Sequence, residues 1–571
     1  MLRLLHRGTS LKLCGALAVN RCGGVVYWYY LVCGNSGGFE KVFYLVSSAE
    51  VLDELGYDYL AVEEGPSRPE LADVTFYDLV PDFAKGPERA REIAFRRLYL
   101  HQVEVLKALS GGANVVVVSG TGSGKTEPWA IYAIRGRLRV LAVYPTLALS
   151  QDQIDRLRSY YSAVGLPNAV VEIDRPVVEG LGGYSQVREA LSRAYVVVTN
   201  PAFLMADLKR LSSPRSRAVL GEFLRDVDLI VIDELDYYGS RRATLLLAMV
   251  ELLERYICRR RPQVVVLAAT LGNPDDVARY LTQVNGRETA VIEGRAFRVP
   301  NRVYAVLGKN LRKLWEHLRG MREVVESAAP ELLPILDNFE TFRLAAPDVV
   351  EALEGAGLKV PELGLDTIEI LAEYVKREEG YVTVVFTPSI RSAEVLARRL
   401  RDKLKRELGE EFKDLIAVHH HLVDPARRRD IEEGARRGRV RVVFTVRTLL
   451  QGIDIGTIAR VVHYGLPEDV REFKQREGRK GRRLEIPFSE TLIFPVKPMD
   501  RVLLELGLEG LREYVSAPLE KVFVNPSNKF VLLFKAMFKL RSGFEDLTKE
   551  ERELLKELKL VTTRRVLFGE G

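Results

Sequence analysis

Short runs of valine, isoleucine and leucine recur along most of this chain of 571 residues, and stretches with helical periodicity separate them. Each run is apolar throughout instead of alternating with polar residues, a pattern typical of parallel strands buried on both faces of a sheet. Five runs precede residue 270 and five follow residue 380, at 114–118, 138–144, 194–198, 228–232, 263–267, 381–386, 415–418, 440–446, 460–463 and 491–494. Because strands and helices alternate regularly, we predict an α/β fold with two tandem, doubly wound parallel sheets.

The regions around the two sheet blocks have a different character and set the expected domain organisation. Residues 25–46 contain two aromatic and β-branched runs joined by a Gly/Asn/Ser turn, which predicts a β-hairpin. The stretch LTKEERELLKELKLVTTRRVLF has the pattern of a helix followed by a strand pair, which is similar to a winged helix. We expect an N-terminal appendage at 1–85, a first sheet domain at 86–300, a helical insertion or linker at 301–378, a second sheet domain at 379–500 and a helical segment at 501–571.

Composition restricts the class of protein. No stretch approaches the ~18 continuous apolar residues that a membrane span needs, and four cysteines without a CxxC pair argue against a disulfide scaffold or a structural zinc site. We therefore predict a soluble, cytoplasmic protein of a reducing compartment with no membrane partner. The net charge of +6 is modest, but arginine clusters at 259–261, 427–429 and 476–483 are compatible with a polyanionic partner.

The most specific motif is SGTGSGKT, which directly follows the apolar run NVVVV. Glycines let the main chain wrap closely around phosphates, and the amides and the N-terminus of the next helix then face the negative charge. Lys125 is placed to reach the β- and γ-phosphates, and the Thr126 hydroxyl to bind Mg²⁺. The predicted nucleotide-binding residues are Gly120, Thr121, Gly122, Ser123, Gly124, Lys125 and Thr126.

A second acidic motif, DELD, follows the apolar run DLIVI. A carboxylate at the carboxyl end of a buried strand, beside a phosphate loop, is suited to bind Mg²⁺. We assign this role to Asp233, and we expect Glu234 to polarise the attacking water. The two motifs together predict hydrolysis of ATP with Mg²⁺.

Around these two motifs the rest of a known series stands in order, and the chain resembles the superfamily-2 DExD/H-box helicases over about residues 95–500. The series comprises Gln102 in LYLHQ, PTLALSQDQ, TNPAFL, AAT, VVFTPSIRSAE, FTVRTLLQGIDIG and QREGRKGR. Within that superfamily, HYGLPEDVREFKQREGRKGR and the LGNP after AAT are similar to RecQ-related YprA-type and Lhr-like DNA helicases. The resemblance implies two RecA-like domains.

The resemblance also implies roles for single residues. Gln102 would read the adenine edge, Asp454 would meet the ribose or an arginine, and Thr270 would couple the ATP state to strand separation. Gln475 would lie near the γ-phosphate, and Arg479 and Arg482 would be the arginine fingers. The nucleic-acid contacts would be Pro145, Thr146, Thr199, Asn200, Thr387, Arg391, Thr445 and Thr448. Each of these eight residues has a structural alternative as a turn, strand end or helix cap.

Two other features favour structural roles. The run His419-His420-His421 lacks a nearby cysteine, and only two of its side chains can share one face of a strand, so we do not predict a metal site. The aromatic run Tyr27-Trp28-Tyr29-Tyr30 could stack on bases, but packing of the appendage is the favoured interpretation.

We predict an ATP-dependent helicase or translocase that acts on single-stranded or tailed nucleic acid, on DNA in preference to RNA. The resemblance implies 3′→5′ movement and a role in repair or replication-associated remodelling. Two departures from the family pattern, Ala268 in place of serine and Asp236 in place of histidine, keep a translocase that does not separate duplexes as an alternative. An RNA helicase and a nucleotide-gated clamp without turnover also remain open.

Overall fold

The computed structural model describes residues 44–120, 122–145, 151–175, 178, 184–213, 218–361, 363–446, 457–467, 469–483, 485–517, 521 and 524–560, together with the backbone of three earlier strands. The chain forms two compact units. The first domain is built mainly from Arg68–Phe297 and the C-terminal helices, and the second mainly from the segments up to Ser67 and from Arg298 to Ala517. No helix in the described part of the chain has the length and apolar character to cross a membrane.

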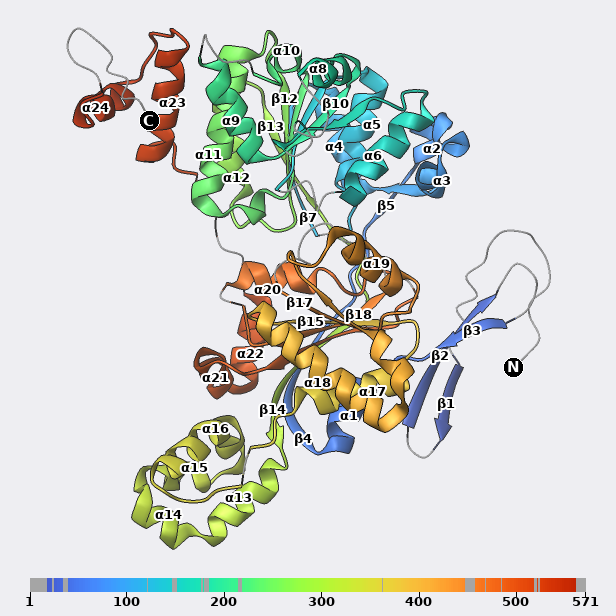
Figure 1. The fold of residues 1–571 in the computed structure, drawn as a ribbon, viewed down its shortest axis with the longest axis vertical. Coiled ribbons are helices and arrows are strands. Elements are labelled where there is room, and N and C mark those ends of the chain that lie inside the picture. The colour runs from blue at the N-terminus through green and yellow to red at the C-terminus, as the bar shows by residue number, and fades with distance from the viewer. Residues whose placement is uncertain are drawn as a thin grey trace. The chain divides into compact units, whose positions relative to one another are not determined.

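The first domain is centred on a sheet of seven parallel strands (Figure 1). In sheet order the strands are β13 (Thr289–Gly294), β7 (Asn114–Ser119), β12 (Gln263–Ala268), β11 (Leu229–Ile232), β8 (Val140–Val143), β10 (Val196–Thr199) and β9 (Val170–Glu172). Alternate residues of each strand enter two separate apolar cores. For example, Val116 lies in one core and Val117 in the other. Both faces of the sheet are therefore buried, as the continuous apolar runs predict.

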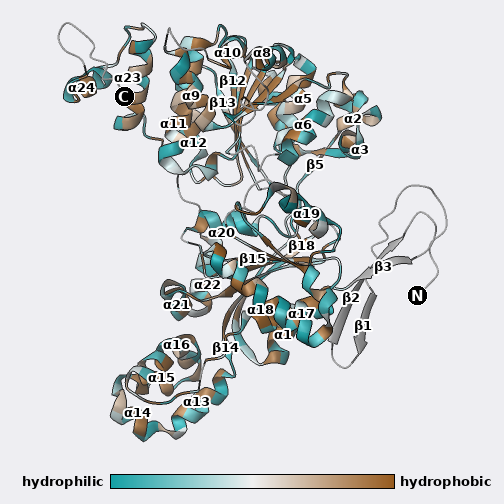
Figure 2. Ribbon diagram, in the orientation of Figure 1, coloured by the Kyte–Doolittle hydropathy of each residue, from teal (hydrophilic) through white to brown (hydrophobic). Residues whose placement is uncertain are grey.

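Helices cover both faces of this sheet, and Figure 2 shows the apolar strands between them. One face carries α8 (Tyr184–Arg193), α9 (Pro201–Leu211), α10 (Gly221–Arg225), α11 (Gly239–Leu252) with the π-helical turn Leu253–Ile257, and α12 (Pro274–Asn285). The other carries α2 (Phe76–Leu79), α3 (Glu88–Ala94), α4 (Leu100–Ser110), α5 (Thr126–Gly136) and α6 (Gln151–Ala163). A two-stranded sheet of β5 (Leu71–Thr75) and β6 (Arg97–Tyr99) precedes α4.

The second domain has its own seven-stranded sheet. In order, its strands are β16 (Ile416–His419), β17 (Val442–Thr445), β15 (Val382–Phe386), β18 (Ile458–Tyr464), β19 (Ser489–Phe494), β14 (Asn301–Lys309) and β4 (Tyr57–Glu64). All neighbours pair in parallel except β14 and β4, which are antiparallel. All ten predicted strands lie in the two sheets, and the predicted fold class is confirmed.

The helices of the second domain fall into three groups. Those beside the sheet are α1 (Ser48–Leu55), α17 (Thr367–Arg377), α18 (Ile390–Leu408), α19 (Pro425–Arg436) and α20 (Val470–Glu477). The inserted group is α13 (Leu311–Gly320), α14 (Arg322–Ala328), α15 (Leu333–Leu336) and α16 (Phe339–Gly355). Two further helices, α21 (Pro498–Glu505) and α22 (Gly507–Ser516), follow β19, and the inserted group and α22 share a core with β14.

The boundaries differ from those expected at the N-terminal side. Residues 57–64, expected in an appendage, form the edge strand β4, and residues 301–309, expected in a helical insertion, form β14. Each of these strands contributes apolar residues, such as Leu60 and Val303, to the core that the second domain shares with its inserted helices. Before them, β1 (Ala18–Cys22), β2 (Val25–Cys33) and β3 (Phe39–Phe43) form a small antiparallel sheet that includes the hairpin of β2 and β3.

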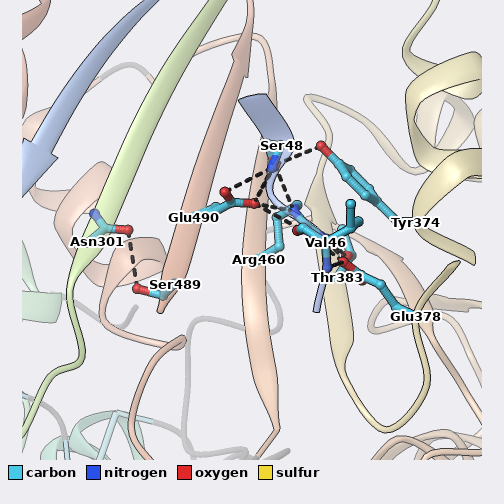
Figure 3. A network of polar contacts seen from close by, with 9 residues as sticks. All are labelled: Val46, Ser48, Asn301, Tyr374, Glu378, Thr383, Arg460, Ser489 and Glu490. Carbon is cyan, nitrogen blue, oxygen red and sulfur yellow. Dashed lines mark hydrogen bonds and ion pairs between the residues drawn. The ribbon is translucent and has the colours of Figure 1, made fainter. Parts of the chain in front are cut away.

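A buried polar network fixes the N-terminal segment to the second domain (Figure 3). Arg460 of β18 is 1% exposed and donates to Glu378 at 3.0 Å, to Glu490 at 2.8 Å and to the carbonyl oxygen of Val46 at 2.9 Å. Its guanidinium carbon lies 3.6 Å from the ring centroid of Tyr374. The Ser48 amide donates to Glu490 at 2.9 Å. Three other stretches of chain therefore meet β18 at this one arginine.

The chain leaves and re-enters the second domain at one place. Ser67 is the last residue before the first domain, and Arg298 is the first residue after its main segment. The Ser67 amide donates to the Arg298 carbonyl at 3.0 Å, and the Arg298 amide donates back at 2.8 Å. The main segment of the first domain, Arg68–Phe297, is thus inserted into the second domain, and the two residues that flank it are hydrogen-bonded to each other.

The C-terminal helices α23 (Lys529–Arg541) and α24 (Lys549–Glu557) belong to the first domain and not to an independent segment. Lys535 forms a buried ion pair with Glu251 of α11 at 2.8 Å, and Phe538 enters the core beside α11. A second buried pair, between Lys539 and Glu551 at 2.9 Å, joins the two helices. The strand pair expected at the end of the chain lies outside the described residues.

Candidate nucleotide site and nucleic-acid interface

A glycine-rich loop joins the end of β7 to the start of α5. Gly122 and Gly124 have φ angles of +87° and +73°, a region that favours glycine. A Cβ atom at Gly124 would lie 2.3 Å from Gln102 Nε2, so no larger residue fits there. The Ser123 amide donates to the Gly120 carbonyl at 3.2 Å and closes the turn. The loop thus presents main-chain amides at the N-terminus of α5, which suits a phosphate group. Thr121 lies outside the described residues.

The two polar side chains that end the loop have defined contacts. Lys125 Nζ donates to the carbonyl oxygens of Ser119 at 2.5 Å and of Gly120 at 3.3 Å. The Thr126 hydroxyl donates to Gln153 Oε1 of α6 at 2.8 Å. Lys125 is therefore folded over the loop, and Thr126 links the loop to the PTLALSQDQ segment.

Gln102 has a different setting from the one predicted. Its side chain is 2% exposed, its Oε1 accepts from the Tyr99 amide at 2.9 Å, and its Nε2 donates to the Gly124 carbonyl at 2.8 Å. Both ends of the amide are thus bonded to main chain, so Gln102 supports the phosphate loop in this conformation and does not present a free edge to adenine. His101 supports the same loop, with its Nε2 3.1 Å from the Ser123 carbonyl oxygen.

Asp233 and Glu234 follow β11 at the carboxyl edge of the sheet. Asp233 is 3% exposed, and its Oδ1 accepts from the Glu234 amide at 2.8 Å. Burial raises the pKa of Asp233 to about 6, against the opposing effect of the Lys125 ammonium. Glu234 has a φ of +49°, a left-handed conformation that a non-glycine residue rarely adopts. Local strain at Glu234 therefore accompanies the placement of the two carboxylates beside the loop.

Sequence reasoning did not assign a role to Asp236, the last residue of DELD, whose side chain contacts the AAT motif. Its side chain is 1% exposed, and it accepts from the Ala269 amide at 3.2 Å and from the Thr270 hydroxyl at 3.1 Å. DELD and AAT are therefore connected through Thr270, although Ala268 has no hydroxyl. The signal was present in the sequence as an acidic residue at the fourth position of DELD.

Glu127 is a second residue that sequence reasoning missed. It follows Thr126 in α5 and is 5% exposed. Its Oε1 accepts from Arg156 at 3.2 Å and from the Tyr160 hydroxyl at 3.1 Å, both in α6. Burial, with Glu127 beside it, raises the pKa of Tyr160 well above its usual value. Through these two hydrogen bonds Glu127 joins α5, the helix that follows the phosphate loop, to α6.

The predicted arginines lie in the second domain, at and after the end of α20. Gln475 is half-buried on α20, Arg479 is 7% exposed, and Arg482 Nε donates to the Gly478 carbonyl at 2.6 Å. On the helix itself, Arg476 pairs with Glu472 at 2.5 Å and lies over the Phe386 ring. The turn that carries Arg479 and Arg482 is thus held against the sheet by buried contacts of α20. Asp454 lies outside the described residues.

Three of the predicted nucleic-acid contacts have buried side chains that are bonded to main chain. Thr199, Thr387 and Thr445 are at most 3% exposed. Their hydroxyls donate to main-chain carbonyl oxygens, of Ile173 at 2.8 Å, of Ser389 at 3.0 Å and of His419 at 2.9 Å respectively. Each threonine ends a strand or follows one, so its hydroxyl is used to fasten the carboxyl edge of the sheet.

The remaining predicted contacts have other surroundings. Asn200 caps α9 by accepting from the Phe203 amide at 2.9 Å, Pro145 is half-buried, and Arg391 is exposed near the start of α18. Thr146 and Thr448 lie outside the described residues. Among the histidines, His419 is 1% exposed with its Nε2 3.1 Å from Glu432 Oε1. In the described ranges, no cluster of three or more His, Cys, Asp or Glu side chains could hold a metal ion.

Comparisons with known families agree with this arrangement. Residues 99–277 match the DEAD/DEAH box helicase family, and residues 366–483 match the helicase conserved C-terminal domain. The chain belongs to helicase superfamily 2. The two matches cover the phosphate loop, DELD and AAT in one sheet, and the motif with Arg479 and Arg482 in the other.

Known proteins are similar to this chain over most of its length. An uncharacterized ATP-dependent helicase of Methanocaldococcus jannaschii is 25% identical over 81% of this chain and 60% of its own length. YprA of Bacillus subtilis, also described as an uncharacterized ATP-dependent helicase, is 24% identical over 76% of this chain and 51% of its own length. The chain therefore spans between half and two thirds of the length of these two relatives.

Solved structures share the fold. The helicase MrfA superposes with a TM-score of 0.63 at 20% identity, over 90% of this chain and 66% of that one. Lhr of Mycobacterium smegmatis superposes with a TM-score of 0.57 at 21% identity, over 84% of this chain and 58% of that one. The two sheets of this chain belong to RecA-like domains, as the resemblance implied.

Proposed function

We propose that this chain is an ATP-dependent motor that moves 3′→5′ on DNA inside the cell and separates its strands. The observation that carries the proposal is the convergence of Lys125, Asp233 and Glu234 at one edge of a parallel sheet, next to a loop whose glycines fit a phosphate chain. Asp236 and Thr270 extend that edge to the AAT segment. Through this hydrogen bond, a change at the nucleotide would be passed from DELD to the AAT motif.

The residues divide the hydrolysis between them. Lys125 would move from the loop carbonyls to the β- and γ-phosphates, and Glu234 would orient the attacking water. Thr126 and Asp233 offer a hydroxyl and a carboxylate oxygen, the ligands that Mg²⁺ prefers, so both fit this ion. Bound there, Mg²⁺ would neutralise charge on the phosphates. Arg479 and Arg482 would stabilise the charge that develops on the γ-phosphate, an effect worth roughly 10³–10⁵ in rate.

DNA is the proposed substrate because relatives point to it. MrfA is described as bound to DNA, and the Mycobacterium smegmatis Lhr as bound to single-stranded DNA and AMP-PNP. On this chain, the exposed Arg391 and the half-buried Asn200, together with main-chain amides, would hold phosphates without reading bases. The 3′→5′ direction rests on the resemblance alone.

The deciding experiment is steady-state ATP hydrolysis without nucleic acid, with single-stranded DNA and with single-stranded RNA. We expect strong stimulation by DNA, and none in Lys125→Ala. Stimulation by RNA alone would keep the motor and reject DNA. The absence of turnover under all three conditions would reject the motor in favour of a nucleotide-gated clamp.

The second candidate is a translocase that leaves duplexes intact. Ala268 favours it, because the hydroxyl usual at that position is absent. The spacing between QGIDIG and QREGRKGR, about 20 residues, leaves no room for a long strand-splitting hairpin. Displacement of a triplex strand without unwinding of a 3′-tailed duplex would select this candidate.

A further inference from the structure

Four buried side chains lie beneath the turn that follows α20. They are His463 of β18, Thr491 of β19, Glu477 at the end of α20 and Lys480 in the turn itself, and none is more than 6% exposed. Lys480 stands in sequence between Arg479 and Arg482. The cluster therefore lies within the motif to which the proposed function assigns the two arginine fingers.

Glu477 is the centre of this cluster. Its Oε1 is 3.1 Å from His463 Nε2, and its Oε2 accepts from Lys480 Nζ at 2.7 Å and from the Thr491 hydroxyl at 2.6 Å. Lys480 also donates to Thr491 Oγ1. The Nδ1 of His463 faces an Nη1 of Arg476 at 3.4 Å, so the ring proton belongs on Nε2, where it donates to Glu477.

The charges are consistent with one ion pair and two neutral partners. Burial alone would raise the pKa of Glu477, but Lys480 and His463 hold that pKa well below its usual range. Burial lowers the pKa of His463 to about 4, so the ring is neutral at pH 7. A buried ion pair requires good geometry to offset its desolvation, and here every oxygen of Glu477 has a donor.

The cluster fixes the turn at several points. Lys480 anchors it from below, and the Gly481 amide donates to the Ile458 carbonyl at 3.0 Å. Gly481 has a φ of +65°, and a Cβ there would lie 2.9 Å from Val299 Cγ2, so the turn is closely fitted to the sheet. Arg482 Nε closes it by donating to Gly478. The turn thus has little freedom to move its arginines.

We propose that Glu477, Lys480, His463 and Thr491 are positioning residues that hold Arg479 and Arg482 in the geometry required for ATP hydrolysis. This inference rests on the proposed function. It assigns the buried ion pair to the catalytic rate and not only to the stability of the second domain.

The same two strands supply a matched control on their other face. Successive residues of a strand point to opposite faces, so Arg460 and Glu490 lie opposite His463 and Thr491 on β18 and β19. Their network with Glu378 is equally buried, and its hydrogen bonds hold the N-terminal segment at Val46 and Ser48 (Figure 3). Glu477→Gln and Glu378→Gln each remove one carboxylate from a buried ionic network of this domain.

The test compares ATP hydrolysis and thermal unfolding in the full chain. At a temperature where all variants are folded, Glu477→Gln and Lys480→Met should lower kcat in the presence of single-stranded DNA at least tenfold, with KM for ATP within threefold. Glu378→Gln should lower the melting temperature at least as much, with kcat within twofold. Equal kcat in all variants, or equal loss in Glu378→Gln, would overturn the inference.

Two further measurements separate this inference from the proposed function. In an Arg479→Ala/Arg482→Ala background, Lys480→Met should change kcat less than twofold, because the arginines through which it acts are gone. A further tenfold loss in that background would contradict the inference. Amide hydrogen exchange at residues 478–482 should be faster in Lys480→Met than in the parent, and this holds without turnover. If the parent hydrolyses no ATP, the proposed function fails, while unchanged exchange would reject the positioning of the turn.

Discussion

The two RecA-like domains of this chain hold their functional residues by different means. In the first domain, hydrogen bonds between side chain and main chain, such as Gln102 to Gly124 and Glu234 to Asp233, hold the phosphate loop and DELD at the edge of a continuous apolar sheet. In the second, ionic networks are buried on both faces of β18 and β19. A loop that must admit a nucleotide can be held by few side chains. Arginines that act from a short turn need a rigid base, because a small displacement of a catalytic group is costly.

The largest expected effect is on ATP hydrolysis, and ATP binding should distinguish a variant of the first domain from one of the second. Lys125→Ala should remove ATP hydrolysis and weaken ATP binding, because its ammonium is the cation of the phosphate loop. Arg482→Ala should lower kcat by roughly 10³-fold or more and leave ATP binding intact. Fluorescent ATP analogues and steady-state kinetics measure the two quantities. Normal turnover in Arg482→Ala would remove this residue from the finger role.

The next effect concerns the stability of one domain. Arg460→Met leaves Glu378 and Glu490 buried without their cation, which should destabilise the second domain by about 3–5 kcal/mol. Calorimetry should show a lower melting transition for the second domain and an unchanged one for the first. The control is Lys535→Met, which breaks the buried pair with Glu251 and should affect the first domain instead. A shift of both transitions by Arg460→Met would show that the domains do not unfold independently.

Acid should weaken the second domain through His463. Its pKa is about 4 in the folded chain against 6.5 in an unfolded one, because burial opposes the charged ring next to Arg476 and Lys480. Between these values the unfolded chain binds a proton that the folded chain does not, so stability falls as the pH drops from 6.5 towards 4. The melting temperature of His463→Gln should depend less on pH in this window. An unchanged pH dependence would mean that other groups dominate.

The smallest effects are expected at two predicted nucleic-acid contacts, the buried hydroxyl of Thr199 and the exposed charge of Arg391. Thr199→Val should cost about 1 kcal/mol of stability and leave the affinity for single-stranded DNA unchanged. Arg391→Ala should leave stability unchanged and reduce the slope of log affinity against log salt by about 0.7, the value for one phosphate contact on a single strand. Titrations at several salt concentrations measure both. A loss of affinity in Thr199→Val would restore this threonine to the strand interface.

The sequence was sufficient for the ten central strands, because continuous apolar runs report burial on both faces. It was not sufficient for β4, in which only Tyr57 and Leu60 are buried and whose partner β14 is far away in the chain. The loop and DELD could be located because glycines and carboxylates at strand ends are locally encoded. The settings of Thr199, Thr387 and Gln102 could not, because a hydroxyl or amide serves main chain and ligand equally well until its neighbours are known.

The pairing of β4 with β14 has a consequence for synthesis. Glu64 and Asn301 are separated by 236 residues, nearly all of them in the first domain. At about 5–20 residues per second, β4 leaves the ribosome roughly 12–50 s before its partner. The sheet of the first domain can therefore form before β4 has its partner strand β14. The connectivity thus sets the order of synthesis: the sheet of the nucleotide-binding domain is complete before β14 and the later strands of the second domain are made.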